Sequence, residues 1–133
     1  FKSKSLTLSL ISSENFGQVT QTVESFFVEN FSVDACHLEI LSDSNLKTLE
    51  DETGLGLSKD IIHMGPLSKE KLHVFFGNEK IQSAVISVMK LQKGFGLLKI
   101  GSHDQTKYLG DGDTAFIEYI RDIIVSVLEA KDA

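Results

Sequence analysis

Two apolar runs separated by only three residues constrain the fold of this chain more than any other feature. The runs are SAVISVMKL (83–91) and FGLLKIGS (95–102), and the residues between them are QKG. Short apolar runs bounded by a glycine-containing turn are typical of β-strands, and so short a connection makes the two strands antiparallel neighbours. The sequence therefore predicts a β-hairpin over residues 83–102.

The register of this hairpin decides which side chains share a face. If paired residue numbers sum to 186, Val88 lies opposite Leu98 and Ile86 lies opposite Ile100. This pairing gives one wholly apolar face, which we expect to be covered by helices.

A third strand is predicted at DACHLEIL, where the pattern of side chains alternates. Cys36, Leu38 and Ile40 point one way, and His37 and Glu39 point the other way. A period of two is that of a half-buried strand. We expect its apolar side to join the apolar face of the hairpin.

The remaining elements follow from helical spacing and from turn residues. Residues 1–11 fit either a strand or a helix by period alone. The elements expected after them are a helix over 15–30, a strand over 34–41, a turn over 42–45, an irregular segment over 46–66, a short helix from Ser68 to Gly77, the hairpin, and a helix over about 113–130. Ser12 and Ser13 are candidate caps of the first long helix, and Asp111 and Asp113 of the last one.

This order predicts an α+β fold for residues 1–133 as one domain. Its centre is an antiparallel sheet, with the N- and C-terminal helices on one face.

Charge and cysteine content exclude several classes of protein. The formal net charge of −6 argues against binding to nucleic acid and against docking on an anionic membrane. No apolar run approaches the roughly 20 residues of a membrane-spanning helix. Cys36 is the only cysteine, which favours a reducing compartment, and we expect a cytoplasmic protein. Because the chain starts at Phe1 and not at Met, we also expect that an N-terminal part of the full-length protein is missing.

Catalytic and metal-binding patterns are weak. His103 and Asp104, with Asp111 and Asp113, could hold a divalent cation, but their spacing matches no calcium loop. The glycines match neither a dinucleotide-binding fingerprint nor a phosphate loop. A lone thiol lacks a resolving partner within the chain. We therefore expect no metal site, no catalytic residues and no enzyme activity, and the sequence identifies no cofactor.

The second face of the predicted sheet is mixed and is the best candidate for a ligand site. In the register above it carries Val85, Ser87, Met89, Leu97, Lys99, His37 and Glu39. Phe75 and Phe76 are expected to cover it. The predicted ligand-binding residues are His37, Glu39, Phe75, Phe76, Ser87, Lys99 and Ser102, with Lys99 suited to a carboxylate or phosphate on the ligand. An equally weighted alternative is a cross-strand Glu39–Lys99 pair on an ordinary solvated face.

Nearly the whole chain resembles a GAF domain. The helical opening followed by the first strand resembles the start of that fold, and the hairpin and final helix resemble its end. A closer resemblance is to an uncharacterised bacterial family of GAF-like proteins, carried by Gly65-Pro66-Leu67, Phe75-Phe76-Gly77, Ser83-Ala84, Gly96-Leu97-Leu98, Gly101-Ser102-His103-Asp104, Tyr108 and Thr114. Asp113 stands where that family often has glycine. Members of that family usually carry an extra N-terminal helical segment, so the resemblance implies that this segment of the full-length protein is missing here.

The resemblance implies a sensory or regulatory domain related to PAS domains that binds an unidentified small molecule. It also implies a homodimer formed through the terminal helices. Candidate interface residues, which fall off the main helical stripes, are Phe1, Leu6, Leu10, Phe31, Ile117 and Val125. The alternative function is a ligand-free module for dimerisation or protein interaction.

Overall fold

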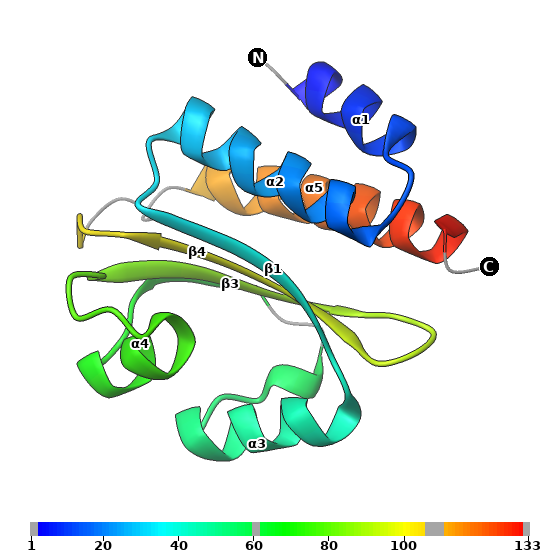
Figure 1. The fold of residues 1–133 in the computed structure, drawn as a ribbon. Coiled ribbons are helices and arrows are strands. Elements are labelled where there is room, and N and C mark those ends of the chain that lie inside the picture. Colours follow the sequence, from blue (N-terminus) through cyan, green and yellow to red (C-terminus); the bar gives the residue numbers. More distant parts are fainter. Residues whose placement is uncertain (1–2, 60–61, 106–110, 132–133) are drawn as a thin grey trace.

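The computed structural model describes residues 3–59, 62–105 and 111–131 (Figure 1). Its helices and strands are, in chain order, α1 (Ser3–Ser12), α2 (Phe16–Phe31), β1 (Ala35–Leu41), α3 (Asp43–Thr53), the 3-10 turn η1 (Leu57–Lys59), β2 (Ile62–Pro66), α4 (Lys69–Phe76), β3 (Ser83–Lys90), β4 (Phe95–Ser102) and α5 (Asp111–Lys131).

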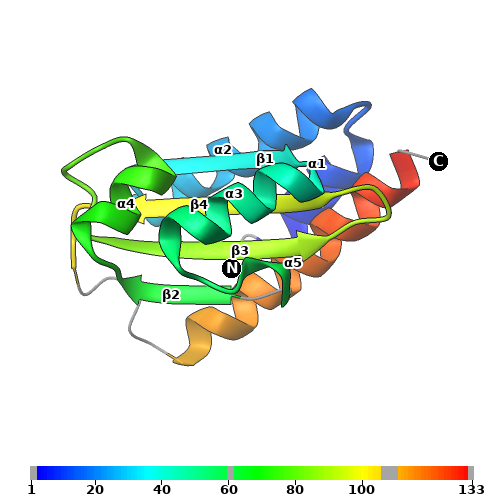
Figure 2. The ribbon, with the colours of Figure 1, turned by 90° about the horizontal axis from the view of Figure 1, so that it is seen from below.

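The four strands form one open antiparallel sheet in the order β1-β4-β3-β2. The helices α1, α2 and α5 lie on one face, and α3 and α4 lie on the other (Figures 1 and 2). The predicted α+β class, the antiparallel sheet and the placement of the N- and C-terminal helices on one face are confirmed. The turn and irregular segment expected over 42–66 are wrong, because α3 and β2 occupy most of that stretch.

The N-terminal segment is helical, and its caps differ from the predicted ones. Asn15 is the N-cap of α2, and its side chain accepts a hydrogen bond from the Gln18 N–H at 2.9 Å. Ser12 and Ser13, the predicted caps, instead donate their hydroxyls back to carbonyls of α1. A serine hydroxyl is short enough for either role, so local sequence does not choose between them.

The predicted hairpin forms, but its predicted register is wrong by one residue. Paired numbers sum to 185, so Val88 lies opposite Leu97, and Ile86 lies opposite Lys99. A shift of one residue moves every side chain of a strand to the other face. Ile86 and Val88 therefore face away from the terminal helices, whereas Val85 and Met89 pack beneath them.

The reason for this error lies in the burial of β3. Seven of its eight residues are buried, so apolar side chains occupy both of its faces. A strand covered on both faces loses the alternation from which a register is read. The turn between the strands also helps to set the observed register. The Leu91 N–H donates to the Gly94 carbonyl, and Gly94 has a φ of 83°.

Two hydrophobic cores lie on opposite faces of the sheet. The terminal-helix core comprises Leu6, Leu10, Val19, Val23, Phe26, Phe27, Val33, Cys36, Leu38, Val85, Met89, Leu98, Ile100, Ile117, Ile120, Ile124, Val127 and Leu128. The cleft-side core comprises Leu46, Leu57, Leu72, Phe75, Ile81, Ala84, Ile86, Val88, Phe95 and Leu97. The second face is therefore packed under α3, η1 and α4, and the alternative of an ordinary solvated face is wrong.

The candidate dimer residues are largely internal to the fold. Leu6, Leu10 and Ile117 are at most 4% exposed and belong to the terminal-helix core. Phe31 and Val125 pack against the same core, and Phe1 lies outside the described residues. Because α1 folds onto α2 and α5, it covers side chains that appeared unpartnered in the sequence.

Candidate functional site

The site lies where α3 and α4 cover the sheet, and both helices have well-defined ends. At α3 the Ser42 side chain accepts from the Asn45 N–H, and Gly54 ends the helix in a left-handed conformation, donating to the Glu50 carbonyl at 2.7 Å. A hydroxyl N-cap and a glycine after the last turn are the usual signals of a short helix.

The ends of α4 follow the same scheme. The Ser68 side chain accepts from the Lys71 N–H, and Gly77, with a φ of 61°, donates to the His73 carbonyl at 2.8 Å. Both ends agree with the prediction from sequence. With only eight residues, α4 depends for its stability on packing of Leu72 and Phe75 into the cleft-side core.

A cleft of about 260 Å³ opens between these helices and the β1–β4 side of the sheet. Its lining residues are Glu39, Leu41, Asn45, Thr48, Leu49, Glu52, Val74, Phe75, Leu97 and Lys99. In Figure 2 both helices lie over the sheet on this side. The cleft has an apolar wall, from both strands and both helices, and a polar rim.

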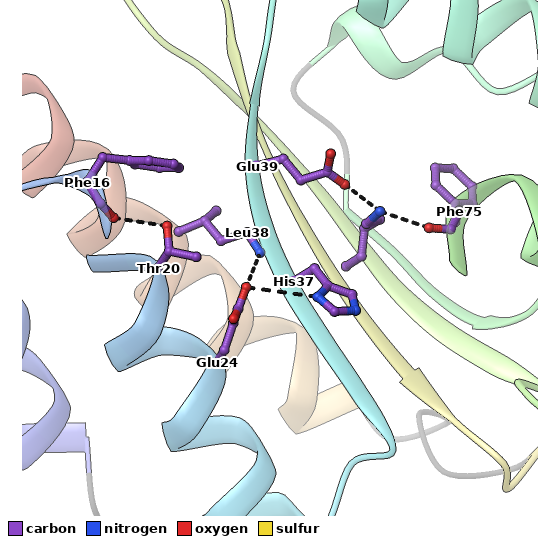
Figure 3. A network of polar contacts seen from close by, with 8 residues as sticks. Phe16, Thr20, Glu24, His37, Leu38, Glu39 and Phe75 are labelled. Carbon is purple, nitrogen blue, oxygen red and sulfur yellow. Dashed lines mark hydrogen bonds and ion pairs between the residues drawn. The ribbon is translucent and has the colours of Figure 1, made fainter. Parts of the chain in front are cut away.

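Lys99 is the central polar group of the cleft. Its ammonium forms an ion pair with Glu39 and donates a hydrogen bond to the Phe75 carbonyl at 2.8 Å. The two contacts are the dashed lines that end at Glu39 and Phe75 in Figure 3. The Lys99 side chain is 13% exposed, whereas that of Glu39 is 40% exposed. The predicted Glu39–Lys99 pair is therefore present, and it fastens the sheet to the C-terminal turn of α4.

Three of the seven predicted ligand-binding residues line the cleft, namely Glu39, Phe75 and Lys99. Ser87 lies on the opposite face, next to Val85 and Met89 in register, which follows from the corrected pairing of β3. Its hydroxyl is buried and has no hydrogen-bond partner among the described residues.

The other three predicted residues have local roles. Ser102 is buried, and its side chain accepts from the Asp104 N–H at 3.0 Å. Phe76 packs against the cleft-side core near Gly101. His37 is on the edge strand with its side chain 57% exposed, and its Nδ1 lies 3.9 Å from a carboxylate oxygen of Glu24.

Glu24 forms a second polar group that sequence reasoning missed. From α2 it accepts a hydrogen bond from the Leu38 N–H at 3.2 Å, as well as approaching His37 (Figure 3). Leu38 is on the edge strand β1, so this carboxylate satisfies an N–H that would otherwise be open to another strand.

Burial, with a further contribution from Glu24, raises the pKa of the Cys36 thiol to about 12. A thiol that stays protonated at neutral pH does not suit a nucleophile.

The larger miss is the α3 side of the cleft. Asn45, Thr48, Leu49 and Glu52 all line it. Their spacing of i, i+3, i+4 and i+7 is that of one helix face. Together with the cap at Ser42, this spacing is the signal that identifies both the helix and the side that faces the cleft.

A larger groove of about 580 Å³ lies along the outer side of α4. It is lined by Lys69, Glu70, Leu72, His73, Asn78, Glu79 and Ile81. Most of these side chains are exposed, and the sheet contributes none of them. The smaller cleft has a rigid floor of strands and is the better candidate site.

The described part of the chain holds no cluster of metal-ligating side chains. Within it, no three side chains of His, Cys, Asp or Glu gather closely enough to hold a metal ion. Asp111 and Asp113, expected as helix caps and as candidate metal ligands, have side chains outside the described residues.

Across the helices that the structure describes, none combines the length and apolar character needed to cross a bilayer.

Comparison with known proteins gives a family and no activity. No curated protein matches the chain. The family model described as "Protein of unknown function, DUF484" matches residues 1–131. The expectation of an uncharacterised family is thereby confirmed, and the chain belongs to the DUF484 family.

Proposed function

We propose that this chain is a GAF-like sensory or regulatory domain of the cytoplasm that binds a small molecule between its sheet and the helices α3 and α4. The observation that carries the proposal is the cleft of about 260 Å³, with strands as its floor and an apolar wall beneath a polar rim. Ligand sites are concave, mostly apolar and supplied with a few placed polar groups. The single cysteine, free and buried, fits a reducing compartment.

The way the cleft is built also supports a regulatory role. Two short helices cover it, and Lys99 joins the sheet to the last turn of α4 through the Phe75 carbonyl. A ligand that touches Lys99 or Phe75 would therefore change how α4 is held on the sheet. A shift in the position of α4 is a signal that another protein could detect.

Native mass spectrometry of the purified protein tests for a bound small molecule. A cleft-filling variant, Thr48→Phe, should lose that molecule, because Thr48 lines the cleft. Lys47→Phe is the matched control, since Lys47 is exposed on the same helix and is not part of the lining. A metabolite panel scored by thermal shift provides the second readout, because a bound ligand stabilises the native state. If no molecule co-purifies, and thermal shifts are equal in wild type and Thr48→Phe, the proposal is rejected.

A second candidate function, self-association through the terminal helices, is favoured by a different observation. On α1, Leu8 and Ile11 are 58% and 62% exposed, and three-residue spacing places them on one side of the helix. Val28 on α2 is 50% exposed. A contiguous exposed apolar patch often marks an interface, and Leu8 and Ile11 would form its centre.

Ile11→Glu tests this second candidate by sedimentation. The variant should shift a dimer toward monomer and leave the fold intact, because Ile11 is exposed. A wild-type chain that is monomeric at tens of micromolar would remove the support for this function. Ile117→Glu is unsuitable, since Ile117 is 4% exposed and the charge would enter the terminal-helix core.

A further inference from the structure

The charge of the cleft differs from what Lys99 alone suggests. Among the described residues, Lys99 is the only basic side chain in the lining, and it is already paired with Glu39 and bonded to the Phe75 carbonyl. With 13% of its side chain exposed, it has little capacity left for an incoming anion. A carboxylate or phosphate on a ligand would have to compete with Glu39 for the same ammonium.

Besides Asn45, whose amide can donate or accept, the other polar groups of the rim offer acceptors. Glu52 lines the cleft, and its carboxylate makes no ion pair or hydrogen bond within the described residues. Thr48 donates its hydroxyl hydrogen to the Ser44 carbonyl at 3.1 Å, which leaves its oxygen free to accept. The lining thus holds two carboxylates against one ammonium. A rim rich in acceptors matches a ligand that brings several donors and a positive charge.

The volume and the apolar wall of the cleft restrict further which kind of ligand it can hold. A volume of about 260 Å³ lies just below the usual range for ligand pockets, roughly 300–1,000 Å³. The apolar wall, which includes Leu41, Leu49 and Leu97, suits a short hydrocarbon body. A bare divalent cation fits poorly, because such ions want six or more oxygen ligands and no third His, Cys, Asp or Glu of the described residues joins these carboxylates.

We propose that the cleft binds a small amphipathic organic cation, an alkylammonium group with a short apolar body. The ammonium lies at the rim between Glu52 and Glu39, and the body lies along the leucines of the wall. This inference rests on the proposed function of the cleft. It reverses the charge expected from the sequence, in which Lys99 was to receive an anion. The net charge of −6 on the whole chain acts in the same direction, since it attracts cations.

The test is an NMR titration of ¹⁵N-labelled 133-residue chain at pH 7 with three probes of equal length. The probes are pentylammonium, pentanoate and 1-pentanol. Pentylammonium should shift the amide signals of Thr48, Leu49 and Leu97 to saturation, with a Kd at least about fivefold below that of pentanoate. The affinity for 1-pentanol measures the contribution of the apolar wall to binding when the probe carries no charge.

Two variants assign the charge effect to a residue. Glu52→Gln keeps the size of the side chain, and should weaken pentylammonium binding about two- to fivefold while leaving 1-pentanol unchanged. Glu118→Gln is the matched control, because Glu118 is exposed on α5, on the other face of the sheet.

The outcomes separate this inference from the proposed function. Pentanoate binding as tightly as pentylammonium, or Glu52→Gln leaving pentylammonium binding unchanged, overturns the inference while the cleft remains a ligand site. If none of the three probes gives saturable shifts at the cleft, the inference fails, and the proposed function is then decided by native mass spectrometry and the metabolite panel.

Discussion

The two faces of the sheet are covered by helices of very different length. On the terminal-helix face, α2 and α5 have 16 and 21 residues. Each packs a continuous apolar stripe of its own against apolar side chains of the strands. On the cleft face, α3 and α4 have 11 and 8 residues, and the Lys99–Glu39 pair lines the cleft. Long helices can cover a strand from end to end, whereas short ones leave space between them. In this fold that space is the candidate binding site, and the other face provides its support.

The largest expected difference between the faces is at two neighbouring leucines of β4. Leu98 is buried in the terminal-helix core, and Leu97 is buried in the cleft-side core, where it also lines the cleft. Leu98→Ala should lower the free energy of unfolding by about 2–5 kcal/mol. Leu97→Ala should cost about 2 kcal/mol, at the low end of that range, because its new cavity merges with an existing cleft that water can enter. Urea denaturation measures both, and a larger loss at Leu97 would contradict the comparison.

The next effect concerns the polar tie across the cleft. Lys99→Met should cost about 1–3 kcal/mol, because the Phe75 carbonyl loses its donor and Glu39 loses its partner. Glu39→Gln should cost less, since Lys99 keeps the bond to Phe75 and Glu39 is already 40% exposed. Lys80→Met, at an exposed lysine, is the control. Equal stabilities of Lys99→Met and Lys80→Met in thermal melts would show that the tie contributes nothing.

A smaller effect is expected where the cleft-side core approaches the backbone. A Cβ on Gly101 would lie 3.0 Å from Ile81 and 3.1 Å from the Phe76 ring. Gly101→Ala should therefore destabilise the fold by about 1–2 kcal/mol through overpacking. Gly56→Ala is the matched control, because no atom lies within 4 Å of its Cβ position. If both variants melt at the wild-type temperature, the packing of Phe76 and Ile81 is looser than the structure implies.

The smallest effect is expected at Ser87, on the terminal-helix face. Its buried hydroxyl has no partner among the described residues, so Ser87→Ala removes a polar group without breaking a hydrogen bond. The variant should lie within about 1 kcal/mol of wild type or be more stable, and it should bind ligand as wild type does. A clear loss of ligand affinity would restore Ser87 to the site and would question the register of β3.

The elements with a strong periodic pattern were predictable, and those without one were not. The stripe of α2 and the paired apolar runs of β3 and β4 identified those elements at nearly their observed bounds. By contrast, the buried residues of α3 are only Leu46 and Thr53, so the helix shows almost no apolar periodicity in the sequence. The strand β2 spans five residues and ends at Pro66, which left it indistinguishable from a loop.

The candidate site was predicted in part, for a related reason. Glu39 and Lys99 were recognisable as charges on otherwise apolar strands, and Phe75 as an anchor of a short capped helix. The Thr48 and Glu52 contributions depended on a helix that had not been recognised. Ser87 was misplaced because the register was off by one residue.

By itself, the sequence determined the class of the fold, the antiparallel hairpin and the terminal helices that cover one face. Periodicity and turn chemistry act between near neighbours, and one chain is enough to read them. Only the tertiary structure decided the register of β3, the burial of Ile117 and the bond from Lys99 to the Phe75 carbonyl. Each of these depends on which distant segment covers a face of the sheet. The register of a strand that is apolar on both faces cannot be read from its own sequence pattern.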